Sequence, residues 1–240
     1  MADPTLPISG FVLRRLLPRN VFRAFFADND SMPDIQTNGR SKAVRASRAS
    51  ELRSLLTPED WVSAATELLV DNGIDAVRVD VVARILKVTR GSFYWHFKDR
   101  RDLLARVLEA WRQGATEQII ERFESHKGDP RELIHELLSL PFRGRAALRA
   151  ARIELAIRAW ARREEMARRA VDEVDARRIA YIAQCFSGLG FPVAEARQRA
   201  FLLYAYEVAE SILVQQGNAA QKRERNALAE QLLLTQLNPA

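Results

Sequence analysis

The chain has 240 residues, of which 48% are hydrophobic, so it can bury one large core or two modest ones and is neither fibrous nor wholly disordered. Cys185 is the only cysteine, which excludes an internal disulfide and a zinc site built from thiolates, and a cytoplasmic location is expected. The formal net charge of +6 suits a polyanionic partner such as nucleic acid, although many soluble proteins are mildly basic.

Residues 1–53 are predicted to form a flexible or partly ordered N-terminal extension. Arginines interrupt the apolar runs of residues 8–26, so this stretch lacks the core of a signal peptide and the length of a membrane span, and no membrane partner is expected. The later part of the extension is polar and basic, without an apolar period. Two alternatives stay open: translation that starts at Met32, or an amphipathic element that rests Phe11 and Phe22 on the body of the protein.

Two short helices are predicted next. The first begins at Thr57, which can cap it, with Asp60 in the reciprocal capping position, and it ends at Gly73. A second helix of about two turns follows by the same spacing rule. The residues that share one side are Trp61, Ala65, Leu68 and Leu69 in the first helix and Val79, Val82, Ala83 and Leu86 in the second.

The stretch VTRGSFYWHFK is predicted to form a third helix with two different faces. Thr89 is a good N-cap, and at about 100° per residue Phe93 and Phe97 fall on one face, where they close a small core. Gly91 and Trp95 fall on the opposite face. A glycine on the outer face of a helix costs about 1 kcal/mol relative to alanine, which suggests that something must approach closely. A DNA groove fits, and the arrangement is that of a helix-turn-helix.

These residues resemble the DNA-binding domain of the TetR family of bacterial transcriptional regulators. The family's hallmark is an apolar helix ending in glycine, a second helix, and a V-[ST]-x-G-[ST]-x-Y-x-x-F run. The resemblance implies an all-α fold, with an N-terminal three-helix helix-turn-helix domain over residues 54–104 and a helical ligand-binding and dimerisation domain over residues 105–240. The matching positions are Gly73, Val79, Val82, Ala83, Val88, Thr89, Gly91, Ser92, Phe93, Tyr94, His96 and Phe97.

The resemblance also implies contacts with a double-stranded DNA operator. Base edges are expected to be read by Thr89, Arg90, Ser92 and Trp95, with Gly91 allowing close approach. Phosphates are expected to be contacted by Thr57, Tyr94, His96 and Lys98, together with Arg78 and Lys87, which depart from the usual family residues. Arg45, Arg48 and Arg53 could follow the DNA as an arm. The alternative for each charged or polar residue is a solvated surface position.

From Asp99 onward the chain is predicted to be helical almost throughout. A helix capped by Asp99 runs to about Glu124, a short helix covers residues 130–140, and two long helices span about residues 146–186. Glutamates and arginines at i,i+4 spacing are expected on solvated faces. These pairs are Glu154 with Arg158, Glu164 with Arg168 and Glu165 with Arg169.

The helix predicted within residues 193–217 is apolar on more than one side. The family resemblance implies that this helix and the Leu-rich segment of residues 226–237 form half of a two-fold four-helix bundle. The expected interface residues are Ala200, Phe201, Tyr204, Ala205, Val208, Ile212, Leu228 and Leu232. The alternative is packing within one chain. The resemblance further implies a pocket for a small-molecule effector, with Trp111, Trp160, Tyr181, Phe186, Tyr204 and Glu207 as candidate lining or as plain core.

No catalytic residue, cofactor or metal site is predicted, because His126 and His135 lack the spacing of metal ligands. The pattern therefore favours a homodimeric transcriptional regulator, a repressor that a small ligand releases from a near-palindromic operator. A regulator gated by a protein partner or by abundance is the alternative. An enzyme built on a helical bundle would need convergent polar groups with shifted pKa values in the body.

Overall fold

The computed structural model of the chain describes residues 56–117, 120–121, 129–142 and 144–236. Within these ranges the backbone forms helices and turns and no β-strand, which confirms the all-α fold expected from the sequence. The expectations for residues 1–53, including DNA contacts by Arg45, Arg48 and Arg53, lie outside the described residues.

The first helices end at residues that cannot continue them. Helix α4 (Pro58–Asn72) begins after Thr57, whose backbone N–H donates to the Asp60 carboxylate at 2.9 Å, and it ends at Gly73, where φ is +80°. The 3₁₀ turn η1 (Ile74–Ala76) and helix α5 (Val79–Ile85) follow. The predicted bounds of both helices are confirmed to within a residue.

The third helix is shorter than predicted. Helix α6 spans only Arg90–Phe93, and the backbone continues in tighter turns through His96. The N–H groups of His96 and Phe97 both donate to the Phe93 carbonyl at 3.0 Å, and such sharing is common where a helix ends. Helix α7 (Arg100–Arg112) then starts at Asp99, whose carboxylate accepts from the Asp102 N–H at 2.8 Å.

A core of aromatic rings holds these helices together and continues into the body. The Phe93 ring lies edge-on to the Trp61 ring, with centroids 5.4 Å apart, and stacks on the Phe97 ring at 5.3 Å. The same buried cluster includes Ile157 and Trp160 from later in the chain. The core of the helix-turn-helix is therefore continuous with part of the body, and the division at residues 104 and 105 stays a prediction.

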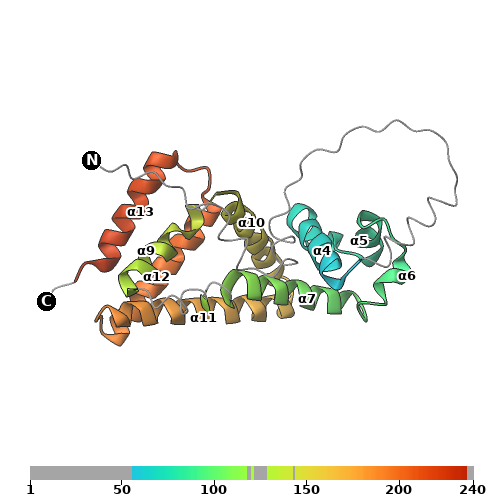
Figure 1. The fold of residues 1–240 in the computed structure, drawn as a ribbon, viewed down its shortest axis with the longest axis horizontal. Helices are drawn as coiled ribbons and strands as arrows, with labels where there is room; N and C mark the ends of the chain where they lie inside the picture. The colour runs from blue at the N-terminus through green and yellow to red at the C-terminus, as the bar shows by residue number, and fades with distance from the viewer. Residues whose placement is uncertain (1–55, 118–119, 122–128, 143, 237–240) are drawn as a thin grey trace.

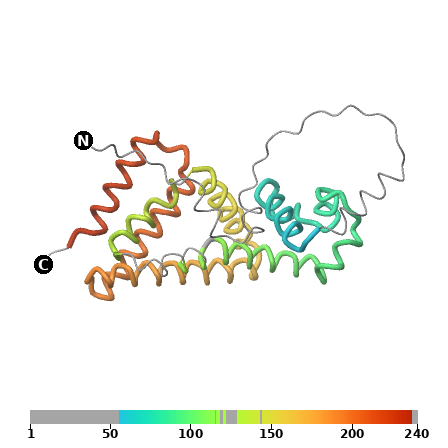
Figure 2. Tube along the Cα trace, in the orientation of Figure 1, coloured from blue at the N-terminus to red at the C-terminus, as the bar shows by residue number. Residues whose placement is uncertain are grey.

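In the body, α11 runs beside α7 and beyond it, α10 lies near α7, and α9, α12 and α13 lie at the end of α11 far from the helix-turn-helix (Figure 1). Helix α7 leads into a π-helical segment, η2 (Gln113–Glu117), and α11 runs beside α7 (Figure 2). Arg112 of α7 pairs with Glu173 of α11 at 3.2 Å. Helix α10 packs between α4 and α11, whereas α9, α12 and α13 form a second core with the C-terminal half of α11. The remaining elements are α9 (Pro130–Ser139), η3 (Leu140–Phe142), α10 (Gly144–Ala161), α11 (Glu165–Gly188), α12 (Val193–Ile212) and α13 (Ala219–Leu234).

Among the described residues, every helix is too short or too polar to cross a lipid bilayer.

Candidate DNA-binding face and buried polar cluster

The aromatic residues of the α6 region divide between core and surface. Phe93 is fully buried and Phe97 nearly so, whereas Tyr94 is 52% exposed and Trp95 is 81% exposed. Leaving a ring as large as indole in water forgoes the free energy of burial, and exposed apolar groups of this kind often mark surfaces that a partner covers. Trp95 therefore has the accessibility that a base contact requires.

Polar groups on this region are engaged only with one another. The hydroxyl oxygens of Thr89 and Ser92 lie 3.3 Å apart, and Arg90 Nη2 donates to the Tyr94 hydroxyl at 3.2 Å. Both contacts are exposed, so the groups can exchange them for DNA contacts at small net cost. The Arg90 guanidinium keeps further N–H donors, which is what bidentate recognition of guanine requires.

Gly91 is exposed, and the surrounding protein does not explain its lack of a side chain. A Cβ atom placed there would meet only the Thr89 hydroxyl oxygen, at an ordinary contact distance of 3.7 Å. A larger residue would therefore fit within the described structure. The absence of an internal requirement for glycine agrees with close approach by an external partner.

The other residues expected on DNA are accessible to different degrees. Thr57, Arg78, Lys87 and Lys98 are exposed, and His96 is half-buried with its ring edge-on to Phe97. Arg78 Nε lies 3.6 Å from an Asp80 carboxylate oxygen, so part of its charge is compensated within the chain. Its phosphate contact is expected to be weaker than that of Lys87.

Lys87 sits in the turn between α5 and α6 with a φ of +58°, in the left-handed region that favours glycine. Replacing Lys87 with Gly is expected to raise the free energy of unfolding by up to about 1 kcal/mol, because the steric strain at Cβ exceeds the entropy that glycine loses. If Lys87 binds a phosphate, the same variant should flatten the slope of log affinity against log salt by about 0.9.

The matched control is Lys87→Asn, because asparagine tolerates the left-handed conformation and removes the same charge. Urea unfolding and DNA titrations at several salt concentrations measure the two effects separately. An unchanged salt slope in both variants would exclude a phosphate contact, and a less stable glycine variant would contradict the strain.

Arg100 holds the helix-turn-helix against α7, a role that no sequence pattern indicated. Its Nε donates to the Val77 carbonyl at 2.5 Å and its Nη2 donates to the Ile74 carbonyl at 2.8 Å. The Ile74 carbonyl also accepts from the Val77 N–H at 3.2 Å, the bond that closes the η1 turn, and Val77 directly follows that turn. Arg100 thereby fixes the connection between α4 and α5 to the first turn of α7. From the sequence alone, Arg100 would be taken for a surface arginine, because its neighbours in the chain are charged.

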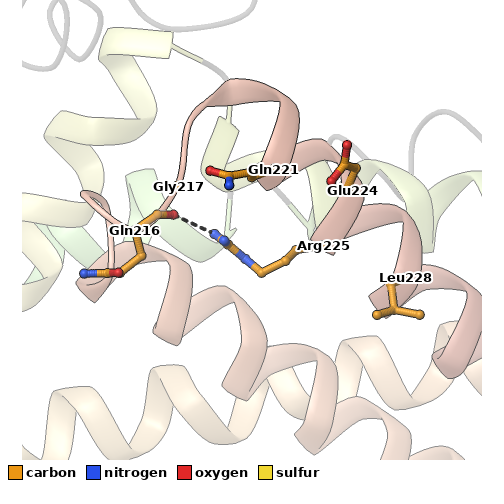
Figure 3. A pocket seen from close by; sticks show the side chains of 6 residues that line it. All are labelled: Gln216, Gly217, Gln221, Glu224, Arg225 and Leu228. Atoms are coloured by element: carbon orange, nitrogen blue, oxygen red, sulfur yellow. Dashed lines mark hydrogen bonds between the residues drawn. The ribbon is translucent and has the colours of Figure 1, made fainter.

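The aromatic residues proposed as pocket lining belong to two different buried clusters. Trp111 and Trp160 belong to the first core, whereas Tyr181, Phe186 and Tyr204 belong to the second. Glu207 lies near the boundary between them. The structure instead has surface hollows lined by other residues. One of about 450 Å³ lies at the turn between α12 and α13, where Arg225 donates to the Gln216 carbonyl (Figure 3), and one of about 940 Å³ lies between η2 and α11.

A buried polar cluster occupies the middle of the body. Arg158 Nη2 donates to Glu154 at 2.8 Å, to Asp175 at 2.6 Å and to the Tyr204 hydroxyl at 2.7 Å. Arg178 Nη1 donates to both Glu154 carboxylate oxygens at 2.9 Å. The side chains of Arg158 and Arg178 are only 22% and 17% exposed, so the expectation of a solvated face is wrong for Arg158.

The expected pairs on α10 and α11 are only partly formed. Glu154 pairs with Arg158, and Glu165 pairs with Arg169 at 2.7 Å, as predicted. Glu164 does not pair with Arg168, because its carboxylate accepts from the Trp160 indole N–H at 2.6 Å across the gap between the two helices. Arg168 pairs with Glu165 and Asp172 instead.

Burial and charge shift the pKa values of this cluster. Burial lowers the pKa of Arg158, but its hydrogen bond to Asp175 and the charge of Glu154 outweigh burial, so the pKa is raised overall. Burial raises the pKa of the Tyr204 hydroxyl, which keeps it a donor to Asp175 at 2.6 Å. Burial also raises the pKa of Glu207 to about 8, although the positive charge of Arg178 opposes the shift.

Replacing Glu207 with Gln is expected to flatten the pH dependence of stability. The pKa of Glu207 is about 8 in the folded chain and near 4.3 in an unfolded chain, so unfolding releases its proton between these values. Folded stability should therefore fall as pH rises through this window, by up to about 1.4 kcal/mol per pH unit, and level off above pH 8.

Urea unfolding at a series of pH values measures this slope. The uncharged amide of the Gln variant has no proton to lose, so its stability should vary less between about pH 6 and pH 8. Glu132→Gln, at an exposed position of α9, is the matched control and should leave the wild-type slope intact. Equal slopes in the wild type and the Glu207 variant would exclude the shifted pKa.

The outer face of α12 and α13 carries the exposed part of the predicted interface. Phe201, Ile212, Leu228 and Leu232 are 61%, 56%, 55% and 64% exposed, and Ala205 is exposed as well. Val208 is half-buried.

Two residues of the predicted interface are buried within the chain. Ala200 is fully buried in the second core and Tyr204 is 6% exposed, since its hydroxyl turns inward to the polar cluster. Neither is available to a partner surface. Leu202, which was not predicted, is 59% exposed on the outer face.

Arginine contacts hold α12 and α13 together at both ends, and the sequence did not indicate them. Arg199 is 5% exposed and donates to the carbonyls of Leu233 and Thr235, which lie at the C-terminal end of α13. Arg225 of α13 pairs with the buried carboxylate of Glu210 at 2.8 Å. The free carbonyls of a helix end need such donors, so the orientation of α13 depends on Arg199.

Comparison with known proteins places the N-terminal part in a family. Residues 62–107 match the family model of bacterial regulatory proteins, tetR family. The HTH-type transcriptional regulator AcrR of Shigella flexneri is 30% identical over 82 residues, which make up 34% of this chain and 38% of AcrR. The matched segments of the curated relatives span well under half of their length, so this likeness concerns the DNA-binding domain.

Solved structures extend the likeness to the whole fold. A transcriptional regulator from Rhodococcus sp. Rha1 has a TM-score of 0.59 at 19% identity, over 75% of this chain and 94% of that one. The transcriptional regulator FadR from Bacillus subtilis, solved in complex with stearoyl-CoA, has a TM-score of 0.53 at 18% identity, over 76% of this chain and 100% of that one. At this level of identity the likeness concerns the fold.

Proposed function

We propose that the chain, whose residues 62–107 match the family model of bacterial regulatory proteins, tetR family, is a homodimeric transcriptional repressor with an N-terminal helix-turn-helix DNA-binding domain. It binds a near-palindromic operator, and a small-molecule effector releases it. The observation that carries the proposal is the outward face of the α6 region, where Trp95 is 81% exposed beside Thr89 and Arg90.

The exposed apolar face of α12 and α13 supports the homodimer. Phe201, Leu202, Leu228 and Leu232 are each more than half exposed. A patch of this composition is typical of a protein–protein interface, and a second copy offers the same patch by two-fold symmetry. Two recognition helices in such a dimer would reach major grooves about 34 Å apart, which predicts an inverted repeat in the operator.

Gating by a small molecule draws support from FadR, which was solved with stearoyl-CoA. The buried arginines, carboxylates and tyrosine of the polar cluster supply polar groups with which an effector could compete. For decisive release, the effector must prefer the form that does not bind DNA by about 5.5 kcal/mol.

A second candidate is a DNA-binding regulator gated by a protein partner or by its own abundance. The specific observation in its favour is that the proposed pocket residues pack into two cores and do not line the hollows described above. Enzyme activity is not proposed, since the matched relatives are DNA-binding regulators.

The test is to mix the full chain with fragmented DNA from its own genome at moderate salt and to sequence the bound fragments. Specific binding survives at salt concentrations where non-specific binding fades. A shared inverted repeat supports the dimeric regulator, and the neighbouring genes indicate candidate effectors. The control is Trp95→Ala, which should fold normally and lose the repeat. If the wild type recovers no motif with or without candidate effectors, the proposal is wrong.

A further inference from the structure

The π-helical segment η2 (Gln113–Glu117) directly follows α7, a helix that leads from the helix-turn-helix into the body. A π-helical turn holds one more residue than an α-helical turn and is rare without contacts that maintain it. A change between the two states shifts the register of every side chain on one side of the segment. The contacts that hold η2 therefore influence how α7 is set against the body.

Consecutive arginines of α11 hold consecutive residues of η2. The Thr116 side chain is almost fully buried, at 1% exposed, and its hydroxyl oxygen accepts from Arg178 Nε at 3.0 Å. The Glu117 carboxylate pairs with Arg177 Nη2 at 2.6 Å. Of these two contacts only the first is shielded from water, so it should contribute more to holding the segment.

Arg178 joins η2 to two further helices. Its Nη1 donates to both oxygens of Glu154 on α10 at 2.9 Å and to the Tyr204 hydroxyl on α12 at 3.1 Å. The guanidinium also lies 6.0 Å from the centroid of the Trp111 ring on α7. Because the guanidinium is rigid and planar, a shift of its Nη1 contacts must also move the Nε that holds Thr116.

Among the described residues of the cluster, Glu207 is the carboxyl group that forms no ion pair with an arginine. Arg158 and Arg178 balance the charges of Glu154 and Asp175. Glu207 Oε1 is buried and has no hydrogen-bond partner within the described part of the chain. The charged groups that act on Glu207 are Arg178 on α11 and Glu154 on α10. A negative charge on Glu207 is repelled by Glu154 and attracts Arg178.

We propose that Arg178 is a positioning residue that holds η2 through Thr116 while Glu207 is neutral and releases it when Glu207 becomes negatively charged. A change in the charge of Glu207 would thereby change the conformation of η2 and, through it, the position of α7. An effect of this change on DNA binding by the α6 region rests on the proposed function. The release of η2 on ionisation of Glu207 does not.

The test is amide hydrogen exchange of the full chain, followed by mass spectrometry of peptides that cover residues 113–117 and corrected for the intrinsic effect of pH. Between about pH 6 and about pH 9, protection of η2 in the wild type should fall about tenfold or more, the effect of one pKa unit of coupling. Glu207→Gln should keep the protection of the lower pH throughout. Thr116→Val should lose protection at both pH values.

Peptides from α4 serve as the internal control, because global unfolding would expose them equally. A fall of protection in η2 that α4 shares, or that Glu207→Gln does not prevent, overturns the inference. An unchanged η2 in Thr116→Val also overturns it. If the exchange pattern is as expected but the chain captures no operator, the proposed function is wrong, whereas the inferred coupling between Glu207 and η2 is supported.

Discussion

Replacing Phe93 with Ala is expected to lower the free energy of unfolding by about 3–5 kcal/mol, a large part of the stability of a domain of this size. The Phe93 ring is fully buried, with the rings of Trp61 and Phe97 packed on it at 5.4 and 5.3 Å. Removing it leaves a cavity in the core shared by the helix-turn-helix and α10, where neighbouring elements are too well anchored to collapse inward. Urea unfolding followed by tryptophan fluorescence measures the loss.

Trp95→Ala is the matched control, because it removes an aromatic ring from the next turn at a position that is 81% exposed. Its free energy of unfolding should stay within about 0.5 kcal/mol of the wild type. Its affinity for the captured operator should nevertheless fall, since the indole is a candidate for contact with bases. A loss below about 1 kcal/mol in the Phe93 variant would contradict the packing described here.

Replacing Arg158 with Ala is expected to lower the free energy of unfolding by about 3 kcal/mol, the lower end of the range for buried ion pairs, because it leaves two partly buried carboxylates without their partner. The Arg158 guanidinium is bonded to Glu154 and Asp175, and its own side chain is 22% exposed. Arg158→Lys keeps the charge but not the planar fork of donors, so it should be destabilised to an intermediate degree. Thermal and urea unfolding of both variants check the order.

The control for Arg158 is Arg168→Ala on the next helix. Arg168 also pairs with two carboxylates, Glu165 and Asp172, but its side chain is 53% exposed. Solvent screening makes such pairs worth little, so this variant should unfold at nearly the same urea concentration as the wild type. Similar losses in the Arg158 and Arg168 variants would mean that burial does not distinguish the two sites.

Local patterns predicted the first helices well because the residues that start and stop them act within a few positions. Thr57, Asp60 and Gly73 bound α4 by contacts inside one turn. The sequence also predicted which residues around α6 face inward, because Phe93 and Phe97, four residues apart, lie on the same side of a helix. The length of α6 did not follow, because the shared Phe93 carbonyl that ends it depends on packing against Trp61.

The sequence predicted the helices of the body but not the polar cluster that forms between them. Arg158 and Arg178 have the same local surroundings as the exposed arginines of α10 and α11, so periodicity could not separate them. Tyr204 was expected at the dimer interface and lies in the polar cluster instead. Arg199, to which no local pattern gave a role, binds the end of α13.

By itself, the sequence determined the all-α class, the capped helices and the division of the aromatic residues around Trp95, because each depends on interactions within a turn or two. Only the tertiary structure decided which arginines are buried and which helix carbonyls they satisfy. It also decided that the proposed pocket residues separate into two cores. These features depend on which helices pack against each other, because the hydrogen-bond and packing partners are far apart in the chain.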